Sequence, residues 1–143
     1  MKISLRSAFG HSTAFGMKTL ARKLGFGFAV FMIVSPAIEE PGVAYELRFV
    51  SARATRSGDG YRLSGRKMFV PYATAASQLL VLARTAGATG DEEGCSLMLV
   101  DREAPGITMT PLATIAPDRQ FQVDFDEVIV PAEAVLGEAG AAL

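Results

Sequence analysis

The chain has 143 residues, of which 50% are hydrophobic and 20% are charged, so its composition predicts one folded domain with a buried core and argues against disorder. Its 14 basic and 15 acidic residues give a net charge of −1, which argues against nucleic-acid binding, since that binding depends on clustered Lys and Arg. The single cysteine, Cys95, excludes an internal disulfide, and with one histidine, His11, the chain offers no His/Cys metal site.

The first 25 residues differ from the remainder of the chain. "MKTLARKLG" predicts a short basic helix ending at Gly25, within a tail that is otherwise irregular over residues 1–25. Residues 17–37 also resemble a secretory signal, but they do not stand at the N-terminus and continue into "IEEPG" without a clear boundary. The apolar stretch Phe26–Val34 is shorter than the ~20 residues of a membrane span. We therefore interpret it as a buried strand, with a signal or membrane role as the alternative.

From residue 26 onward the sequence is typical of β-strands separated by turn signals. The strand-like segments are "ELRFVSARAT", "YRLSGRKMFV", "SQLLVLAR", "CSLMLVD", "ITMTPL" and "FQVDFDEVIV". "GDG" at residues 58–60 predicts a hairpin turn, Gly65 predicts a bulge or a second turn, and "TAGATGDEEG" predicts a long polar turn. The predicted fold class is all-β: one barrel or sandwich-like domain over residues 26–140, built from short, mostly antiparallel strands, with a short helical or irregular N-terminal tail.

Few side chains offer chemistry of their own. Asp124, Asp126 and Glu127 stand close together, and paired carboxylates can act as acid and base. Period-two alternation places the two aspartates on one strand face and the apolar residues between them toward the core, so we favour a solvated face. Cys95 within "CSLMLV" is favoured as a buried strand residue over a nucleophile, and a lone cysteine suits a reducing compartment such as the cytoplasm. His11 lies in the weakly patterned tail and receives no role.

A cluster of unusual residues closes the predicted strand over residues 61–70. Gly65, Lys67, Phe69 and Pro71 alternate within a few positions. We expect Gly65 to form a bend and Lys67 to face solvent. Phe69 lies beside Pro71, whose fixed backbone could present the ring outward, where it could stack on a flat ligand. From the residues alone, core packing or termination of an edge strand is favoured over ligand stacking at Phe69.

Four segments, taken in order, give the sequence a specific resemblance. They are "SPAIEEPG", "ARATRSGDGYRLSGRKMFVPYATAASQLLVLART", "LMLVDREAPGITMTPL" and "VDFDEVIVPAEAVLGEAG". Over about residues 27–140 the chain resembles the middle β-domain of the flavin-dependent acyl-CoA dehydrogenases. The resemblance implies an FAD-dependent oxidoreductase of fatty acid metabolism that removes hydrogen from the α and β carbons of an acyl-CoA thioester, the β-hydrogen leaving as hydride to the flavin. It also implies a homo-oligomer in which FAD lies between the β-domain and a helical bundle.

The same resemblance assigns cofactor-binding roles to five residues. Phe69 falls where the family has an aromatic residue beside the isoalloxazine ring, and Val70 follows it. Pro71 falls where a threonine hydrogen-bonds the flavin, and proline has neither a hydroxyl nor an N–H to offer. Ile38 and Glu39 fall on the threonine–glutamate–proline motif at the flavin, with Glu39 in place of the threonine. A carboxylate there would oppose flavin reduction if it points inward.

The substrate side is less complete. Tyr45 falls where the family has a serine near the acyl-CoA, so it is the candidate substrate-binding residue. The family's catalytic glutamate lies in a C-terminal helical bundle that nothing in this sequence matches, so no catalytic residue is assigned and the isolated chain is expected to be inactive or very slow. The predicted function is an acyl-CoA dehydrogenase-like flavoprotein, with no metal, membrane or nucleic acid. The alternative is an inactive fragment or a non-enzymatic β-domain that assembles with a separate helical partner.

Overall fold

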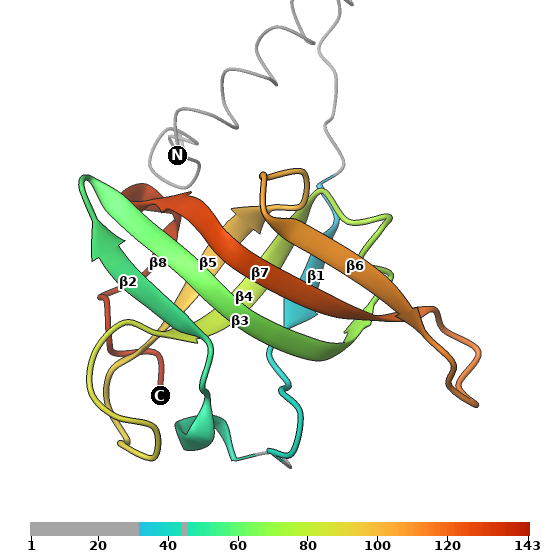
Figure 1. Ribbon diagram of the computed structural model, residues 1–143, viewed down its shortest axis with the longest axis horizontal. Coiled ribbons are helices and arrows are strands. Elements are labelled where there is room, and N and C mark those ends of the chain that lie inside the picture. Colours follow the sequence, from blue (N-terminus) through green and yellow to red (C-terminus); the bar gives the residue numbers. More distant parts are fainter. Residues whose placement is uncertain (1–31, 44–45) are drawn as a thin grey trace, which may run out of the picture.

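Two twelve-residue strands, β3 (Gly60–Pro71) and β7 (Gln120–Pro131), pair antiparallel through the middle of the computed structural model, which describes residues 32–43 and 46–143 (Figure 1). A tight turn joins β3 to β2 (Arg53–Ser57), and Gly58 in this turn has a φ of 57°. Glycine adopts this positive φ without the steric clash of a Cβ. The hairpin that "GDG" predicted is therefore confirmed.

The remaining elements extend the same sheet. They are β1 (Val34–Ala37), the 3-10 helix η1 (Leu47–Phe49), β4 (Gln78–Arg84), β5 (Cys95–Asp101), β6 (Ile107–Leu112), the 3-10 helix η2 (Ala132–Ala134) and β8 (Val135–Leu136). The strand order is β6-β7-β3-β2-β4-β5-β8, and β1 pairs parallel with β4 outside this path. Every other pairing is antiparallel except a single parallel pair between β2 and β4. The predicted all-β fold class is confirmed.

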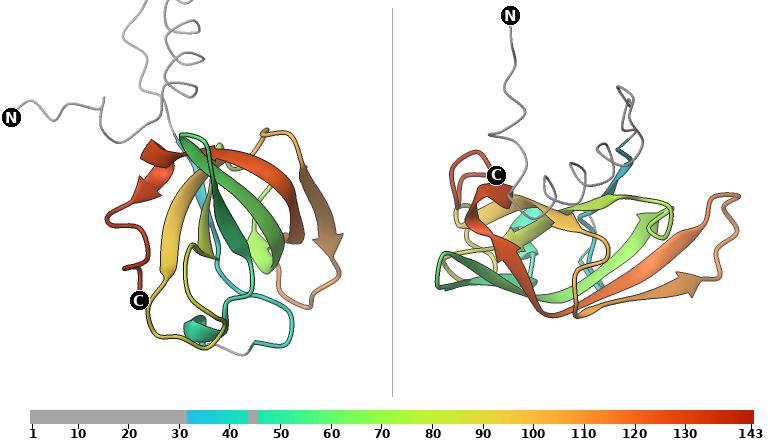
Figure 2. Two further views of the ribbon diagram at one scale, coloured as in Figure 1. Left: turned by 60° about the vertical axis from the view of Figure 1, so that its left-hand side comes forward. Right: turned by 90° about the horizontal axis from the view of Figure 1, so that it is seen from above.

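The sheet is bent so that β4 and β5 pass behind β3 and β7, and the core lies between these two layers (Figures 1 and 2). The side chains that fill it include Leu63, Val70, Leu79, Val81, Met98, Val123 and Val128, all fully buried. β4 is buried along almost its whole length, as its unbroken apolar sequence predicts. Cys95 is buried at the start of β5, also as predicted. Within the described residues, no helix is long and apolar enough to cross a membrane.

The pairing of β3 with β7 slips twice, and each slip is a β-bulge. The first adds a residue to β7 opposite Ser64, where Glu127 has a φ of 51°. Gly65 lies beside it with a φ of 149°, and a Cβ there would come within 2.6 Å of the Ala52 Cβ. The second slip adds a residue to β3 just before Val70. The prediction of a bulge or turn at Gly65 is resolved as a bulge, and the extra residue belongs to the partner strand.

Lys67 corrects the sequence interpretation. We expected it to face solvent, and this expectation was wrong: its side chain is 0% exposed and pairs with the Glu40 carboxylate. Alternation along β3 points Lys67 to the same side as the buried Leu63, and Glu40 supplies the charge that makes burial tolerable. The strand pattern alone gave no sign of this partner, because Glu40 is distant in sequence.

The start of the chain departs in part from expectation. The strand predicted over residues 26–34 was to end at Val34, whereas β1 begins at Val34 and pairs parallel with β4. Residues 26–31 lie outside the described part of the structure. The predicted tail over residues 1–25, with its helix ending at Gly25, also lies outside it. The described domain therefore begins with the residues that lead into β1.

Candidate functional site

A cleft of about 480 Å³ lies between the end of β3, the residues after β1 and the segment around η1. Four of the residues that the sequence singled out line it together: Ile38, Glu39, Phe69 and Pro71. The adjacent Val70 points the other way, because its side chain is fully buried in the core. The sixth candidate, at position 45, is outside the described residues. The structure thus brings two separate sequence segments to one concave surface.

Phe69 owes its place in the cleft to the second bulge. Simple alternation along β3 would bury this ring beside Lys67, but Phe69 has a φ of 54° and its side chain is 48% exposed. Tyr72 follows with a φ of 47° and is also exposed. Left-handed backbone at bulky residues is strained, and such strain concentrates at functional sites. The bulge therefore presents an aromatic face to the cleft at a cost in backbone energy.

Pro71 ends β3 and is one of the residues that line the cleft. Its carbonyl accepts a hydrogen bond from Ser35 Oγ, which ties the end of β3 to β1. A proline has no N–H, so Pro71 has no backbone donor for a ligand in the cleft. Its contribution to the cleft is a rigid apolar surface beside Phe69.

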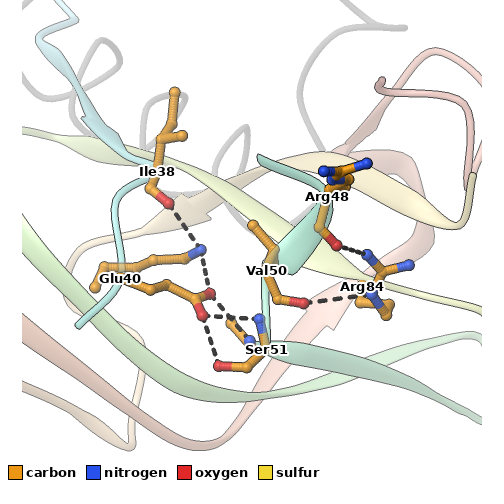
Figure 3. A network of polar contacts seen from close by, with 8 residues as sticks. Ile38, Glu40, Arg48, Val50, Ser51 and Arg84 are labelled. Atoms are coloured by element: carbon orange, nitrogen blue, oxygen red, sulfur yellow. Dashed lines mark hydrogen bonds and ion pairs between the residues drawn. The ribbon is translucent and has the colours of Figure 1, made fainter. Parts of the chain in front are cut away.

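A buried ion pair borders the cleft, and one of its members, Glu40, is among the lining residues. Figure 3 shows the network of polar contacts around this pair. Lys67 Nζ donates to Glu40 Oε1 at 2.7 Å and to the Ile38 carbonyl at 3.1 Å. The Glu40 carboxylate also accepts from the Ser51 N–H at 2.7 Å, the Ser51 hydroxyl at 2.6 Å and the Ala52 N–H at 3.0 Å. One carboxylate therefore joins three parts of the chain: the end of the segment after β1, β3, and the stretch that leads into β2.

The two partners of this pair are both shifted from their ordinary pKa. Burial raises the pKa of Glu40, but the Lys67 charge and the hydrogen bonds from Lys67 and Ser51 outweigh it and hold that pKa below 4.5. Burial lowers the pKa of Lys67 by more than the Glu40 charge raises it. Glu40 is consequently ionised at neutral pH, and Lys67 is the residue that forms an ion pair with it.

A second buried cation, Arg84 at the end of β4, holds the neighbouring segment (Figure 3). Its guanidinium donates to the Arg48 carbonyl at 2.6 Å, to the Val50 carbonyl at 3.3 Å and to the Glu93 carbonyl at 3.0 Å. No ion pair of Arg84 with a carboxylate occurs within the described residues. Arg84 therefore binds loop backbone through hydrogen bonds alone.

The charge in the cleft is negative at its rim. Glu39 is exposed and lines the cleft, and Glu46 lines it from the opposite segment while pairing with Arg48 at 2.9 Å. Most of the other lining side chains are apolar, among them Leu47 and Met68. In the described part of the chain no three acidic, histidine or cysteine side chains gather closely enough to hold a metal ion. The cleft suits a flat apolar group better than an anion.

Sequence reasoning missed the two buried cations. The sequence did carry a sign that Lys67 is buried, because alternation along the strand places it on the same side as Leu63 and Gly65. Arg84 is the last residue of the apolar strand β4. A cation at this place must either be buried or mark the end of the strand. Neither signal identifies the partners, because Glu40 is 27 residues from Lys67 and Arg84 reaches Arg48 and Val50, 36 and 34 residues away, as well as the nearer Glu93.

Comparison with known families decides the relationship of the chain. The family described as "Acyl-CoA dehydrogenase, middle domain" matches residues 35–128, which include β2 to β6 and most of β1 and β7. The chain belongs to the acyl-CoA dehydrogenase family. The predicted resemblance is thereby confirmed, and the cleft described above lies within the matched residues.

Individual relatives agree. Acyl-CoA dehydrogenase FadE12 of Mycobacterium tuberculosis is 33% identical over 109 residues, which cover 75% of this chain and 28% of FadE12. The acyl-CoA dehydrogenase structure from Geobacillus kaustophilus matches with a TM-score of 0.71 and 31% identity, over 76% of this chain and 30% of that one. The ChsE4-ChsE5 complex of Mycobacterium tuberculosis matches with a TM-score of 0.72 and 28% identity, over 77% of this chain and 28% of that one. The chain thus spans less than a third of the length of these acyl-CoA dehydrogenase relatives.

Proposed function

We propose that this chain supplies the flavin-facing β-domain of an FAD-dependent acyl-CoA dehydrogenase. The observation that supports the proposal most strongly is the exposed Phe69 ring, which a bulge turns into an apolar cleft. Ile38 and Glu39, which the family resemblance assigns to the same cofactor, line the same cleft from another segment. Two candidate segments that are separate in the sequence therefore face one ligand-sized space.

The residues present fit the isoalloxazine ring in shape and polarity. Phe69 offers a face for stacking, and Leu47, Val50 and Met68 offer apolar walls that exclude water. Pro71 offers no N–H, and Glu39 brings a negative charge to a ring system that gains negative charge on reduction. We therefore expect the flavin ring to be held mainly by packing, more weakly than a threonine at each position would hold it.

The chain's own residues would bind and orient, and bound FAD would supply the hydride acceptor for α,β-dehydrogenation of an acyl-CoA thioester. Phe69 and Ile38 would hold the flavin ring by packing against it. Tyr45 is retained as the candidate contact to the acyl-CoA. No residue of this chain is assigned as the base that takes the α-proton. We therefore expect the isolated chain to turn over acyl-CoA very slowly or not at all.

A flavin titration tests the proposal. The chain is purified without added flavin, FAD is added, and quenching of flavin fluorescence and the visible spectrum of the bound flavin are recorded. We expect saturable binding with a perturbed visible band, and negligible dye-linked dehydrogenation of acyl-CoA. Absence of any FAD uptake would contradict the flavin-binding role, and robust turnover by the isolated chain would contradict the expected inactivity.

A non-enzymatic role in assembly is the second candidate. Large apolar side chains at Ile33, Leu47, Phe69 and Tyr72 are exposed, and exposed apolar surface of this kind is typical of protein contacts. A helical partner or further copies of this chain would cover it, and the solved relative ChsE4-ChsE5 is itself a complex. Light scattering on the purified chain decides: a monomer at all concentrations, with FAD bound, argues against the assembly role as the main function.

We also propose a cytoplasmic location. Burial raises the pKa of the single thiol, Cys95, which keeps it neutral and unreactive and is compatible with a reducing compartment. Cell fractionation with an antibody against the chain would test this location, and recovery outside the cytoplasmic fraction would contradict it.

A further inference from the structure

Residues 46–52 form one wall of the cleft, and this segment has little regular secondary structure to hold it. Leu47 and Val50 face the cleft from this segment, and only the short η1 lies within it before β2 begins. Its backbone is instead held by buried side chains from elsewhere. The Ser51 and Ala52 N–H groups donate hydrogen bonds to the Glu40 carboxylate. The Arg84 guanidinium donates to the Arg48 and Val50 carbonyls.

The opposite wall is attached to the same buried group. Lys67 Nζ holds the Ile38 carbonyl at 3.1 Å and Glu40 at 2.7 Å, while the Met68 N–H donates to the Glu39 carbonyl at 2.8 Å. Lys67 also stands two residues before Phe69 on β3. One ion pair therefore connects both walls of the cleft to the strand that presents the aromatic ring (Figure 3).

Stability alone gives little reason for a buried pair at this place. The desolvation of two charges offsets most of their attraction, and apolar replacements of buried pairs are often neutral or stabilising. Both side chains of this pair are at most 2% exposed, and their other hydrogen bonds reach the Ser51 hydroxyl and the backbone of both cleft walls. The pair therefore has a geometric consequence that an apolar pair would lack. That consequence is a fixed distance between the walls.

We propose that Lys67 and Glu40 are positioning residues that set the width of the cleft beside Phe69. The pair links Glu40 and the Ile38 carbonyl to Ser51 and the Ala52 N–H, so it fixes the spacing of the two segments from which Ile38 and Val50 line the cleft. Its effect on the cofactor rests on the proposed function, namely that the cleft holds the flavin ring. Its effect on the wall itself is independent of any ligand.

The experiment uses the full 143-residue chain in four forms: wild type, E40D, the double variant E40Q/K67M, and R66A as the matched control. E40D keeps both charges but withdraws the carboxylate by one methylene. The double variant removes both charges, so it leaves no uncompensated buried ion. Arg66 is the neighbouring cation on β3, and its ion pair with Asp124 lies on the exposed side of the strand. Each form is studied by thermal unfolding, by hydrogen–deuterium exchange without ligand, and by FAD titration.

For E40D and E40Q/K67M we expect cooperative unfolding, faster exchange confined to residues 46–52, and about tenfold weaker FAD binding with a changed visible band of the bound flavin. R66A should match wild type in exchange and binding. The positioning role would be overturned if residues 46–52 of a folded variant, E40D or E40Q/K67M, exchanged at the same rate as in wild type. Exchange that rises equally over the whole sheet would also overturn it, since that indicates general destabilisation. If wild type itself takes up no FAD, the proposed function fails, and the exchange data still decide the positioning role.

Discussion

The two buried cations, Lys67 and Arg84, lie close to the same cleft wall but are compensated in opposite ways. Lys67 faces a carboxylate, Glu40, and shares it with two backbone N–H groups. Arg84 faces only backbone carbonyls, which come from residues 48–50 and from the loop after β4. Lys67 is thus compensated by an opposite charge, whereas Arg84 is compensated only by hydrogen bonds to backbone carbonyls.

This difference has consequences for mutation. Removal of one member of a charge pair leaves the other member buried without a compensating charge. Removal of the second member as well eliminates this uncompensated charge. Removal of Arg84 leaves several carbonyls without a donor, and no single further substitution can supply them. The Lys67 site should therefore show strong coupling between two positions, and the Arg84 site should show none.

The largest effect on stability is expected for Lys67→Met. The free energy of unfolding should fall by about 3–5 kcal/mol, because the Glu40 carboxylate is left buried without its cation. E40Q/K67M should recover part of this loss, with a coupling free energy of about 1–3 kcal/mol in a double-mutant cycle measured by urea unfolding. Additive single effects would show that the two side chains do not act as a pair.

A smaller loss, about 2–3 kcal/mol, is expected for Arg84→Met. The carbonyls of Arg48 in η1 and of Glu93 in the loop after β4 lose their donor, but both residues are exposed, so water can reach these carbonyls once the guanidinium is gone. Arg84→Lys retains the charge without the planar fork and should fall between wild type and Arg84→Met. A greater loss for Arg84→Met than for Lys67→Met in the same urea series would reverse the proposed ranking.

Acid should weaken the pair through Glu40. Because the folded-state pKa of Glu40 lies below 4.5, its contribution to stability is fully present above that pH and is lost as the pH falls through the folded pKa. Unfolding free energies measured below pH 4.5 should therefore decline more steeply in wild type than in E40Q. The same slope in both proteins would mean that other carboxyl groups account for the acid sensitivity.

The smallest effect is expected for Arg66→Ala, which removes an exposed pair on the strand that also carries Lys67. The Arg66 side chain is 54% exposed, so its ion pair with Asp124 is screened by water and should contribute less than about 1 kcal/mol. High salt should reduce even this difference. An effect equal to that of Lys67→Met would show that burial does not distinguish the two pairs.

The sequence predicted the features that depend on local chemistry. The apolar runs of β4 and β5 and the turn at Gly58 follow from burial and from positive φ, which neighbouring residues determine. The solvated side of β7 was predicted as well, although alternation fails at its bulge, where Glu127 is inserted. Local patterns were sufficient here because no distant partner was needed.

The candidate site was predicted only in outline, since its geometry depends on distant contacts. Ile38, Glu39, Phe69 and Pro71 meet at one cleft as the family resemblance implies. The strand parity of Lys67 with Leu63 indicated burial, but its partner could not be inferred, because Glu40 approaches it only after the chain has folded back. The outward direction of Phe69 likewise depends on the register with β7, and a register shift of one residue leaves no mark in the sequence of β3.

FAD binding to wild type, Phe69→Ala and Ile129→Ala tests the account most directly. Ile129 is an apolar side chain on β7 that is 74% exposed and does not line the cleft, so it controls for general loss of apolar surface. In equilibrium dialysis we expect wild type and Ile129→Ala to bind FAD alike and Phe69→Ala to bind about tenfold or more weakly, because the stacking face is lost. Equal FAD binding by all three proteins would contradict the assignment of the cleft to the flavin.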